Sequence, residues 1–207
     1  MPAVNTPVPA LDIAIGPLAA ARRLALQKAL LNSRDPLYAI VDVAIDERLY
    51  DALQAEPAAS QVVCLYDGDP AIRYARYAPY LMRVHDGSPL FLRWLGEEGW
   101  QKNWGVFIAS SLALSALKRH LKRFITTTDP HGKTLWLRFY DPRVLPNLLA
   151  GFNPGNLQDW FRGNAITACL APVPQGVWRG APLKSGFDHI TGVARLESRI
   201  WEVSASC

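Results

Sequence analysis

The stretch YAIVDVAIDERLYDALQAE, residues 38–56, decides the fold because its hydrophobic pattern changes halfway along. Its first six residues form a mostly apolar run rich in β-branched side chains, which is typical of a strand covered on both faces. The second half places Ile45, Leu49 and Leu53 four residues apart, so that they share one face of a helix. We therefore predict a strand followed by a helix, with Asp46 as the helix N-cap.

Strand-like and helix-like patterns keep alternating along the rest of the chain. Because the connections include both helices and short turns, this order predicts an α/β domain with a mixed β-sheet flanked by helices. Further extended segments are expected at 62–66, 79–85, 104–109, 134–140, 165–170 and near the C-terminus. Helices are expected at 17–31, 89–99, 111–125, after residue 141 and at 157–161.

The organisation along the chain predicts three parts. Residues 1–35 form a proline-punctuated tail followed by a helix, 36–172 form the α/β domain, and 173–207 form a C-terminal extension. In the helix at 17–31 the leucines are spread around the helical wheel, so the pattern assigns no apolar face to it.

Length and composition indicate one soluble globular domain. Of the 207 residues, 50% are hydrophobic and 19% are charged, which are values typical of folded proteins. The 22 basic and 18 acidic residues leave a net charge of +4, too small an excess to indicate nucleic acid by itself. Three widely separated cysteines favour neither disulfides nor a zinc site. Since no signal-peptide pattern or membrane-spanning apolar stretch is recognisable, we expect a cytoplasmic protein without membrane insertion.

The segment 111–125 carries the clearest amphipathic pattern. Its apolar residues fall within one arc of the helical wheel, the opposite side carries cations, and His120 lies at the border. The cations are Lys118, Arg119, Lys122 and Arg123. A basic helix face can contact phosphate groups, but a solvated surface requires the same cations, and no aromatic residue is interleaved for stacking on bases. A basic nucleic-acid-binding protein is therefore kept as an alternative.

The run RFYDPR, residues 138–143, raises the question of catalysis because it gathers two arginines, a tyrosine and an aspartate. Residues 134–140 alternate in the manner of an inner strand that is covered on both faces. An Asp-Pro pair then suits the start of a helix, as N-cap and as a first residue that needs no donor. We interpret the run as a structural motif. Its members are Arg138, Tyr140, Asp141, Pro142 and Arg143.

Two residues of this region carry further expectations. Burying Arg138 without a partner would be costly, so its guanidinium is expected to bond a carboxylate, either Asp42 or Asp141. Pro146 would remove a backbone hydrogen bond from the second turn of the helix that follows. The helix is therefore expected to begin later or to bend.

The triplet Asp67-Gly68-Asp69 is the most enzyme-like pattern, because two carboxylates at a strand end can hold a divalent metal and a nucleotide diphosphate. A metal-dependent nucleotide-sugar-type enzyme is therefore a second alternative. The central glycine and the following proline are equally typical of a turn. The four histidines show no metal-ligand spacing, and the sequence contains no P-loop, GxGxxG or GxSxG motif. We expect no enzymatic activity, no cofactor and no metal.

Five stretches, in a fixed order, resemble one known family: 38–44, 78–84, 94–111, 117–124 and 135–145. They are similar to the domain of unknown function found in adaptor chaperones of the bacterial type VI secretion system. The resemblance runs from Tyr38 to Pro172, and the chain departs from it at Arg162-Gly163-Asn164, where a glycine-proline pair is expected. Six residues stand at the family's motif positions: His120, Arg123, Arg138, Tyr140, Asp141 and Arg143.

The resemblance implies a cytoplasmic, non-enzymatic protein that binds a cognate toxic effector and helps to load it onto the VgrG spike protein. It also implies an α/β fold, and it brings no catalytic role to the motif residues. We predict partner contacts at the chain ends, 1–35 and 172–207, and on the basic face of the helix at 111–125. The candidate partner-binding residues there are Arg119, His120 and Arg123.

Overall fold

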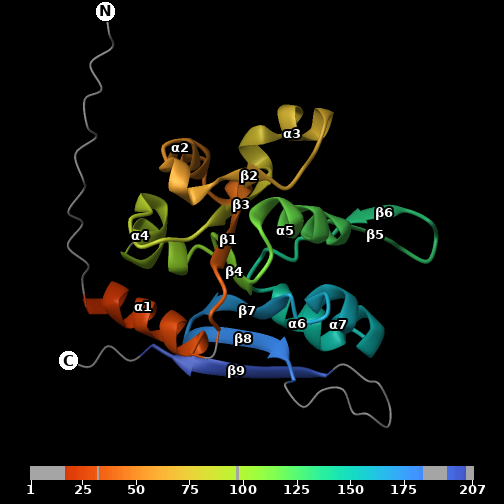
Figure 1. Ribbon diagram of the computed structural model, residues 1–207. Coiled ribbons are helices and arrows are strands. Elements are labelled where there is room, and N and C mark those ends of the chain that lie inside the picture. Colours follow the sequence, from red (N-terminus) through yellow and green to blue (C-terminus); the bar gives the residue numbers. More distant parts are fainter. Residues whose placement is uncertain (1–16, 32, 97, 184–194, 204–207) are drawn as a thin grey trace, which may run out of the picture.

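The computed structural model describes residues 17–31, 33–96, 98–183 and 195–203, and Figure 1 shows the arrangement of their helices and strands. A 7-stranded sheet has the order β2-β3-β1-β4-β7-β8-β9, and a 2-stranded sheet pairs β5 with β6. The strands are β1 Leu37–Asp42, β2 Val63–Cys64, β3 Pro79–Arg83, β4 Gly105–Ser110, β5 Thr126–Thr128, β6 Thr134–Trp136, β7 Ile166–Val173, β8 Gly176–Pro182 and β9 Leu196–Glu202. The α-helices are α1 Pro17–Ala29, α2 Arg48–Gln54, α3 Asp69–Arg73, α4 Pro89–Gly96, α5 Leu114–Leu121, α6 Leu145–Gly151 and α7 Pro154–Phe161.

The α/β class with a sheet flanked by helices is confirmed, but the pairing in the sheet is more uniform than the sequence predicts. All neighbouring strands of the 7-stranded sheet run antiparallel, whereas the sequence predicts a mixed sheet. The reason lies in the crossover between β3 and β4, which run in the same direction while β1 lies between them. A helical connection such as α4 therefore joins two strands that are not neighbours.

The two faces of the sheet carry separate hydrophobic cores, and β1 contributes to both. Ala39 and Val41 point toward the face that α1, α2 and α4 cover, while Tyr38 and Ile40 point toward α5, α6 and α7. This alternation is what a strand covered on both sides requires. On the second face Trp160 of α7 is fully buried, so this helix supplies a large part of that core.

Helix α1 buries a face that its leucines do not mark. The buried residues are Ala19, Arg22, Ala25, Leu26 and Ala29, whereas Leu18 and Leu24 remain 44% and 49% exposed. Arg22 is satisfied inside the protein because its Nη1 donates to the carbonyl of Leu95 at 2.7 Å. Three of the five buried residues are alanines, so the face of α1 that packs on the sheet shows no leucine stripe in the sequence.

The predicted inner strand over 134–140 is wrong. Only Thr134–Trp136 is extended, and it pairs with β5 in a hairpin that lies outside the main sheet (Figure 1). Leu135 and Trp136 are exposed there, while Phe139 and Tyr140 are buried in the turn that follows. The apolar alternation therefore combines two environments, an exposed hairpin and a buried turn.

Other predicted boundaries shift by a few residues. The strand expected at 62–66 shortens to two residues, and α5 begins at Leu114 instead of 111. The segment that the sequence separates as 173–207 supplies β8 and β9 to the same sheet. In the described part of the chain, no helix has the length and apolar character needed to cross a membrane.

Candidate functional site

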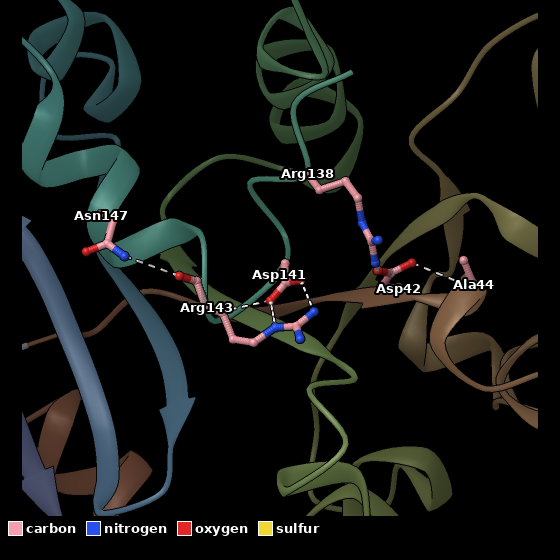
Figure 2. A network of polar contacts seen from close by, with 6 residues as sticks. All are labelled: Asp42, Ala44, Arg138, Asp141, Arg143 and Asn147. Carbon is pink, nitrogen blue, oxygen red and sulfur yellow. Dashed lines mark hydrogen bonds and ion pairs between the residues drawn. The ribbon is translucent and has the colours of Figure 1, made fainter. Parts of the chain in front are cut away.

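Asp42 and Arg138 form the first half of the candidate site (Figure 2). Asp42 ends β1 and is 1% exposed, and its Oδ1 accepts a hydrogen bond from the backbone N–H of Ala44 at 3.2 Å. The guanidinium of Arg138 donates to Oδ2 of the same carboxylate. Of the two partners predicted for Arg138, Asp42 is therefore the one that it bonds.

Asp141 and Arg143 form the second half, two residues apart on the turn before α6 (Figure 2). The Arg143 Nη2 and Nε donate to the two carboxylate oxygens at 2.6 and 2.9 Å, and its backbone N–H donates to Oδ1 at 2.9 Å. Asp141 thus caps a turn, and α6 begins only at Leu145, with Pro146 in its first turn where no backbone donor is needed. The expected later start of this helix is confirmed.

The two buried carboxylates have pKa values displaced in opposite directions. Burial raises the pKa of Asp42, and the hydrogen bond and charge of Arg138 only partly offset this effect. Burial also raises the pKa of Asp141, but the hydrogen bonds and charge of Arg143 outweigh it and hold that pKa below its ordinary value. Both carboxylates have arginine partners, and neither is positioned as an open base.

Aromatic residues extend the site toward the hairpin. Tyr140 is 5% exposed, its phenol interacts with that of Tyr66, and burial raises the pKa of both groups. Tyr66 in turn contacts the ring of Trp136, with 5.1 Å between ring centroids. Trp136 itself is 58% exposed, and the partly exposed guanidiniums of Arg138 and Arg143 follow it in the same segment, 136–143. We call Trp136, Arg138 and Arg143 the motif surface.

The Asp67-Gly68-Asp69 triplet does not gather its carboxylates. Lys118 and Lys122 of the α5 region both bond Asp67, the first at 2.6 Å, and their hydrogen bonds lower the pKa of Asp67 to about 2. Asp69 is instead the first residue of α3 and is followed by Pro70, which fits the turn interpretation. Within the described ranges no group of three or more His, Cys, Asp or Glu side chains could hold a metal ion.

The predicted partner-binding residues of α5 lie in different environments. Arg119 is exposed, and Arg123 is exposed and paired with Asp159 at 2.7 Å. His120, predicted at the border of the helix, is 2% exposed, and its Nε2 donates to the carbonyl of Trp160 at 2.8 Å. Burial lowers the pKa of His120. As folded, its imidazole supports α7 and is not presented to a partner.

Sequence reasoning missed a second polar cluster, which joins Glu56, Ser60 and His85. Nδ1 of His85 accepts from the backbone N–H of Gly87, so its Nε2 carries the proton and donates to the Ser60 hydroxyl at 3.0 Å. Ser60 in turn donates to Glu56, whose other oxygen accepts from Leu90 N–H at the start of α4. Proton donation therefore runs from histidine to serine, the reverse of what a general base needs. No residue spacing in the sequence signals this cluster.

The turn at Arg162-Gly163-Asn164, where the resemblance implies a glycine-proline pair, has a distinctive backbone. Arg162, Gly163 and Asn164 after α7 have φ values of 45°, 59° and 70°. Proline fixes φ near −65°, so a proline at 163 or 164 would be incompatible with this turn.

Comparison with known proteins gives one match. The family model described as "Domain of unknown function (DUF4123)" matches residues 37–159, more than half of the chain. No curated protein and no solved structure matches. The matched region contains the whole Asp42–Arg138 and Asp141–Arg143 arrangement, while α1 and β7 to β9 lie outside it. The chain therefore belongs to the family of the domain of unknown function DUF4123.

Proposed function

We propose that this protein is an adaptor chaperone of a bacterial type VI secretion system. It binds a cognate toxic effector in the cytoplasm, helps to load it onto the VgrG spike protein, and acts by binding and not by turning over a substrate. The observation that carries this proposal is membership of the DUF4123 family over residues 37–159. The link to secretion is the resemblance of this domain to the one in adaptor chaperones of the type VI system.

The geometry of the motif supports a binding role. The carboxylates of Asp42 and Asp141 are buried and bonded to arginines, so the groups that reach the surface are guanidiniums and an indole. The side chains of Arg138 and Arg143 are 45% and 63% exposed. Arginine and tryptophan are among the residue types enriched at the energetically dominant contacts of protein interfaces. Each guanidinium is also held in place by its carboxylate, which reduces the entropy lost on binding.

We assign effector contact to the motif surface and also to Arg119 and Arg123, on the basic face of the segment 111–125. The chain ends stay in the proposal as further contact regions. In the N-terminal end, the exposed side of α1 is the surface that a partner can reach, since its other side packs on the sheet.

Co-purification from the native host tests the function and the surface separately. A tagged wild-type chain is expected to capture a toxin whose gene neighbours its own, together with VgrG. The variants Trp136→Ala and Arg143→Glu are expected to reduce effector capture at least roughly tenfold, as loss of an interface anchor does. Ile72→Ala, on α3, is the matched control because Ile72 is 80% exposed and lies outside the assigned surface.

The outcomes separate the two parts of the proposal. If wild-type protein captures neither effector nor VgrG, the adaptor function is wrong. If capture occurs but the Trp136 and Arg143 variants bind as well as the Ile72 control, the function stands and the motif surface is not the contact. Turnover of a small molecule by the purified chain, lost in Asp67→Asn, would support the enzyme alternative instead.

A further inference from the structure

The two edges of the main sheet differ in length. The edge strand β2 contains two residues, and such short edge strands offer little backbone for pairing. The opposite edge strand, β9, contains seven residues, has no proline, and pairs with β8 without a bulge. In the part of the chain that the structure describes, no strand pairs with the outer side of β9. Natural proteins usually protect an edge strand of this length against pairing with other chains, so we looked for a strand that could pair with the outer side of β9.

The hydrogen bonds on the inner side show which residues of β9 have free backbone groups. The carbonyl of Arg195 accepts from Leu183 N–H, and the N–H of Val203 donates to the carbonyl of Gln175. Backbone groups alternate sides along a strand, so the odd-numbered residues turn theirs toward β8. The outward N–H and C=O groups belong to Leu196, Ser198, Ile200 and Glu202.

The two faces of β9 carry different side chains: one has a glutamate and an arginine of opposite charge, and the other has two apolar residues. Glu197 and Arg199 lie on the face of Trp201, which packs with the core under α1, and their charged groups are 3.4 Å apart. Leu196 and Ile200 lie on the opposite face, where Ile200 is 54% exposed.

We propose that β9 pairs antiparallel with β9 of a second copy of this chain, with Ser198 opposite Ser198 on the twofold axis. In this register each Glu197 lies opposite an Arg199, and each Leu196 lies opposite an Ile200. Opposite charges and apolar pairs directly across from one another stabilise a sheet. The resulting dimer is isologous, as a twofold interface requires, and its main sheet continues across the two chains.

The neighbouring registers are less favourable. In an antiparallel pair, residues whose N–H and C=O groups point outward must lie opposite each other. The twofold axis therefore passes through one residue of β9, and moving it to the next residue gives the next possible register. Centring on Arg199 sets two arginines directly opposite each other, and centring on Glu197 opposes two glutamates as well as Arg195 and Arg199. Centring on Ile200 leaves Arg199 opposite Trp201. Among these four registers, charge complementarity therefore favours the one centred on Ser198, and it favours a second copy over an unrelated strand.

Charge reversal with complementation tests this dimer in the full-length chain. Sedimentation velocity is expected to show a dimer for the wild type and self-association at least roughly tenfold weaker for Glu197→Arg or Arg199→Glu, since each places like charges opposite twice. An equimolar mixture of the two variants restores every opposite-charge pair and is expected to form a heterodimer. The double variant E197R/R199E is expected to dimerise with itself.

Two controls keep the result interpretable. Glu202→Arg changes the net charge by the same amount as Glu197→Arg but lies outside the central pairs, so it is expected to dimerise normally. Ser198→Pro removes an outward N–H without removing a bond to β8 and is expected to be folded and monomeric. The proposal is overturned if the wild type sediments as a monomer, if the single reversals leave the dimer intact, or if the mixed variants fail to associate.

Discussion

Asp42 and Asp141 are both buried and both bonded to arginine, yet their pKa values shift in opposite directions. Burial has the larger net effect on the pKa of Asp42, and hydrogen bonding and charge have the larger net effect on that of Asp141. Asp42 accepts one backbone bond and one arginine bond, whereas Asp141 accepts a bidentate guanidinium and a backbone N–H. A carboxylate that accepts several bonds is stabilised in its charged form. The two residues should therefore respond to acid in opposite ways.

We expect Asp42→Asn and Asp141→Asn to differ in the pH dependence of their effects. Because the folded-state pKa of Asp42 lies above its reference value of 3.8, the folded protein binds protons more readily there, and the stability of wild type relative to D42N should rise as pH falls from about 7 to about 4. The pKa of Asp141 lies below 3.8, so its stabilisation is present above that pH and should be lost only as pH falls below it. Urea denaturation at several pH values measures both differences; parallel curves for the two variants would contradict the assignment.

Removing Arg138 alone should lower the free energy of unfolding more than removing both members of the Asp42–Arg138 ion pair. In Arg138→Met the buried Asp42 keeps only the N–H of Ala44, and we expect a loss of about 1–3 kcal/mol, reduced from a fully buried pair because Arg138 is 45% exposed. The double variant D42N/R138M removes the unpaired charge and should recover part of that loss. A double-mutant cycle from denaturation curves measures the coupling. Additive effects would mean that the bond contributes nothing.

At the scale of elements, the helices differ in how their first N–H groups are satisfied. Asn153 caps α7 by accepting from the Asn156 N–H at 2.8 Å, as an N-cap residue does. Helix α5 has no side-chain cap, because Ala113 holds its N-cap position and an alanine side chain cannot accept a hydrogen bond. The nearby Ser110 hydroxyl donates to the Ala165 carbonyl instead. One helix is therefore capped well and the other can be improved.

Opposite substitutions test this difference. Asn153→Ala should lower the free energy of unfolding by about 1 kcal/mol, because it leaves an N–H of α7 without its acceptor. Ala113→Asp should raise it by about 0.5–1 kcal/mol, because the extended backbone at Ala113 suits an N-cap and the carboxylate also meets the positive end of the helix dipole. Thermal unfolding of both variants beside wild type gives the signs. Destabilisation by Ala113→Asp would mean that α5 begins elsewhere.

The sequence predicts an element correctly where its residue pattern is compatible with only one kind of structure. Strand β1 follows directly from its β-branched run, and helix α4 from the Ser88-Pro89 pair, in which the Ser88 hydroxyl accepts from the Phe91 N–H. The hairpin strand at 134–136 was not predictable, because apolar alternation looks the same in an exposed hairpin and in an inner strand. The buried face of α1 could not be recognised in the sequence, because most of its residues are alanines.

The contacts of the candidate site likewise include some that could be predicted from the sequence and some that could not. The need of Arg138 for a carboxylate follows from the cost of burying a charge, so the sequence could name Asp42 as one of two candidates, and the structure decides between it and Asp141. The lysines that bond Asp67, and the bond from His120 to Trp160, join residues brought together only by the packing of α5. Their spacing in the sequence carries no signal of contact.

At the scale of the whole molecule, the regions outside the family match pack against each other. Helix α1 contributes Leu26 to the core that also contains Val177 of β8, and Trp201 of β9 packs against the same core. Figure 1 shows α1 beside these two strands, far from the hairpin. The N-terminal helix and the last strands therefore complete one core face, so deleting either would disturb folding as well as any partner contact.

Point substitutions on the two sides of α1 separate packing from partner contact. Leu26 is 2% exposed, and Leu26→Ala should lower the free energy of unfolding by about 2–5 kcal/mol, because it removes apolar contacts and leaves a cavity beside the sheet. Leu24 is 49% exposed, and Leu24→Ala should change stability by no more than about 0.5 kcal/mol. Urea denaturation measures both, and equal small effects would mean that α1 does not dock on the sheet. Because Leu24→Ala preserves the fold, any loss of effector capture in that variant reports on the exposed side of α1 itself, which truncation of the chain cannot do.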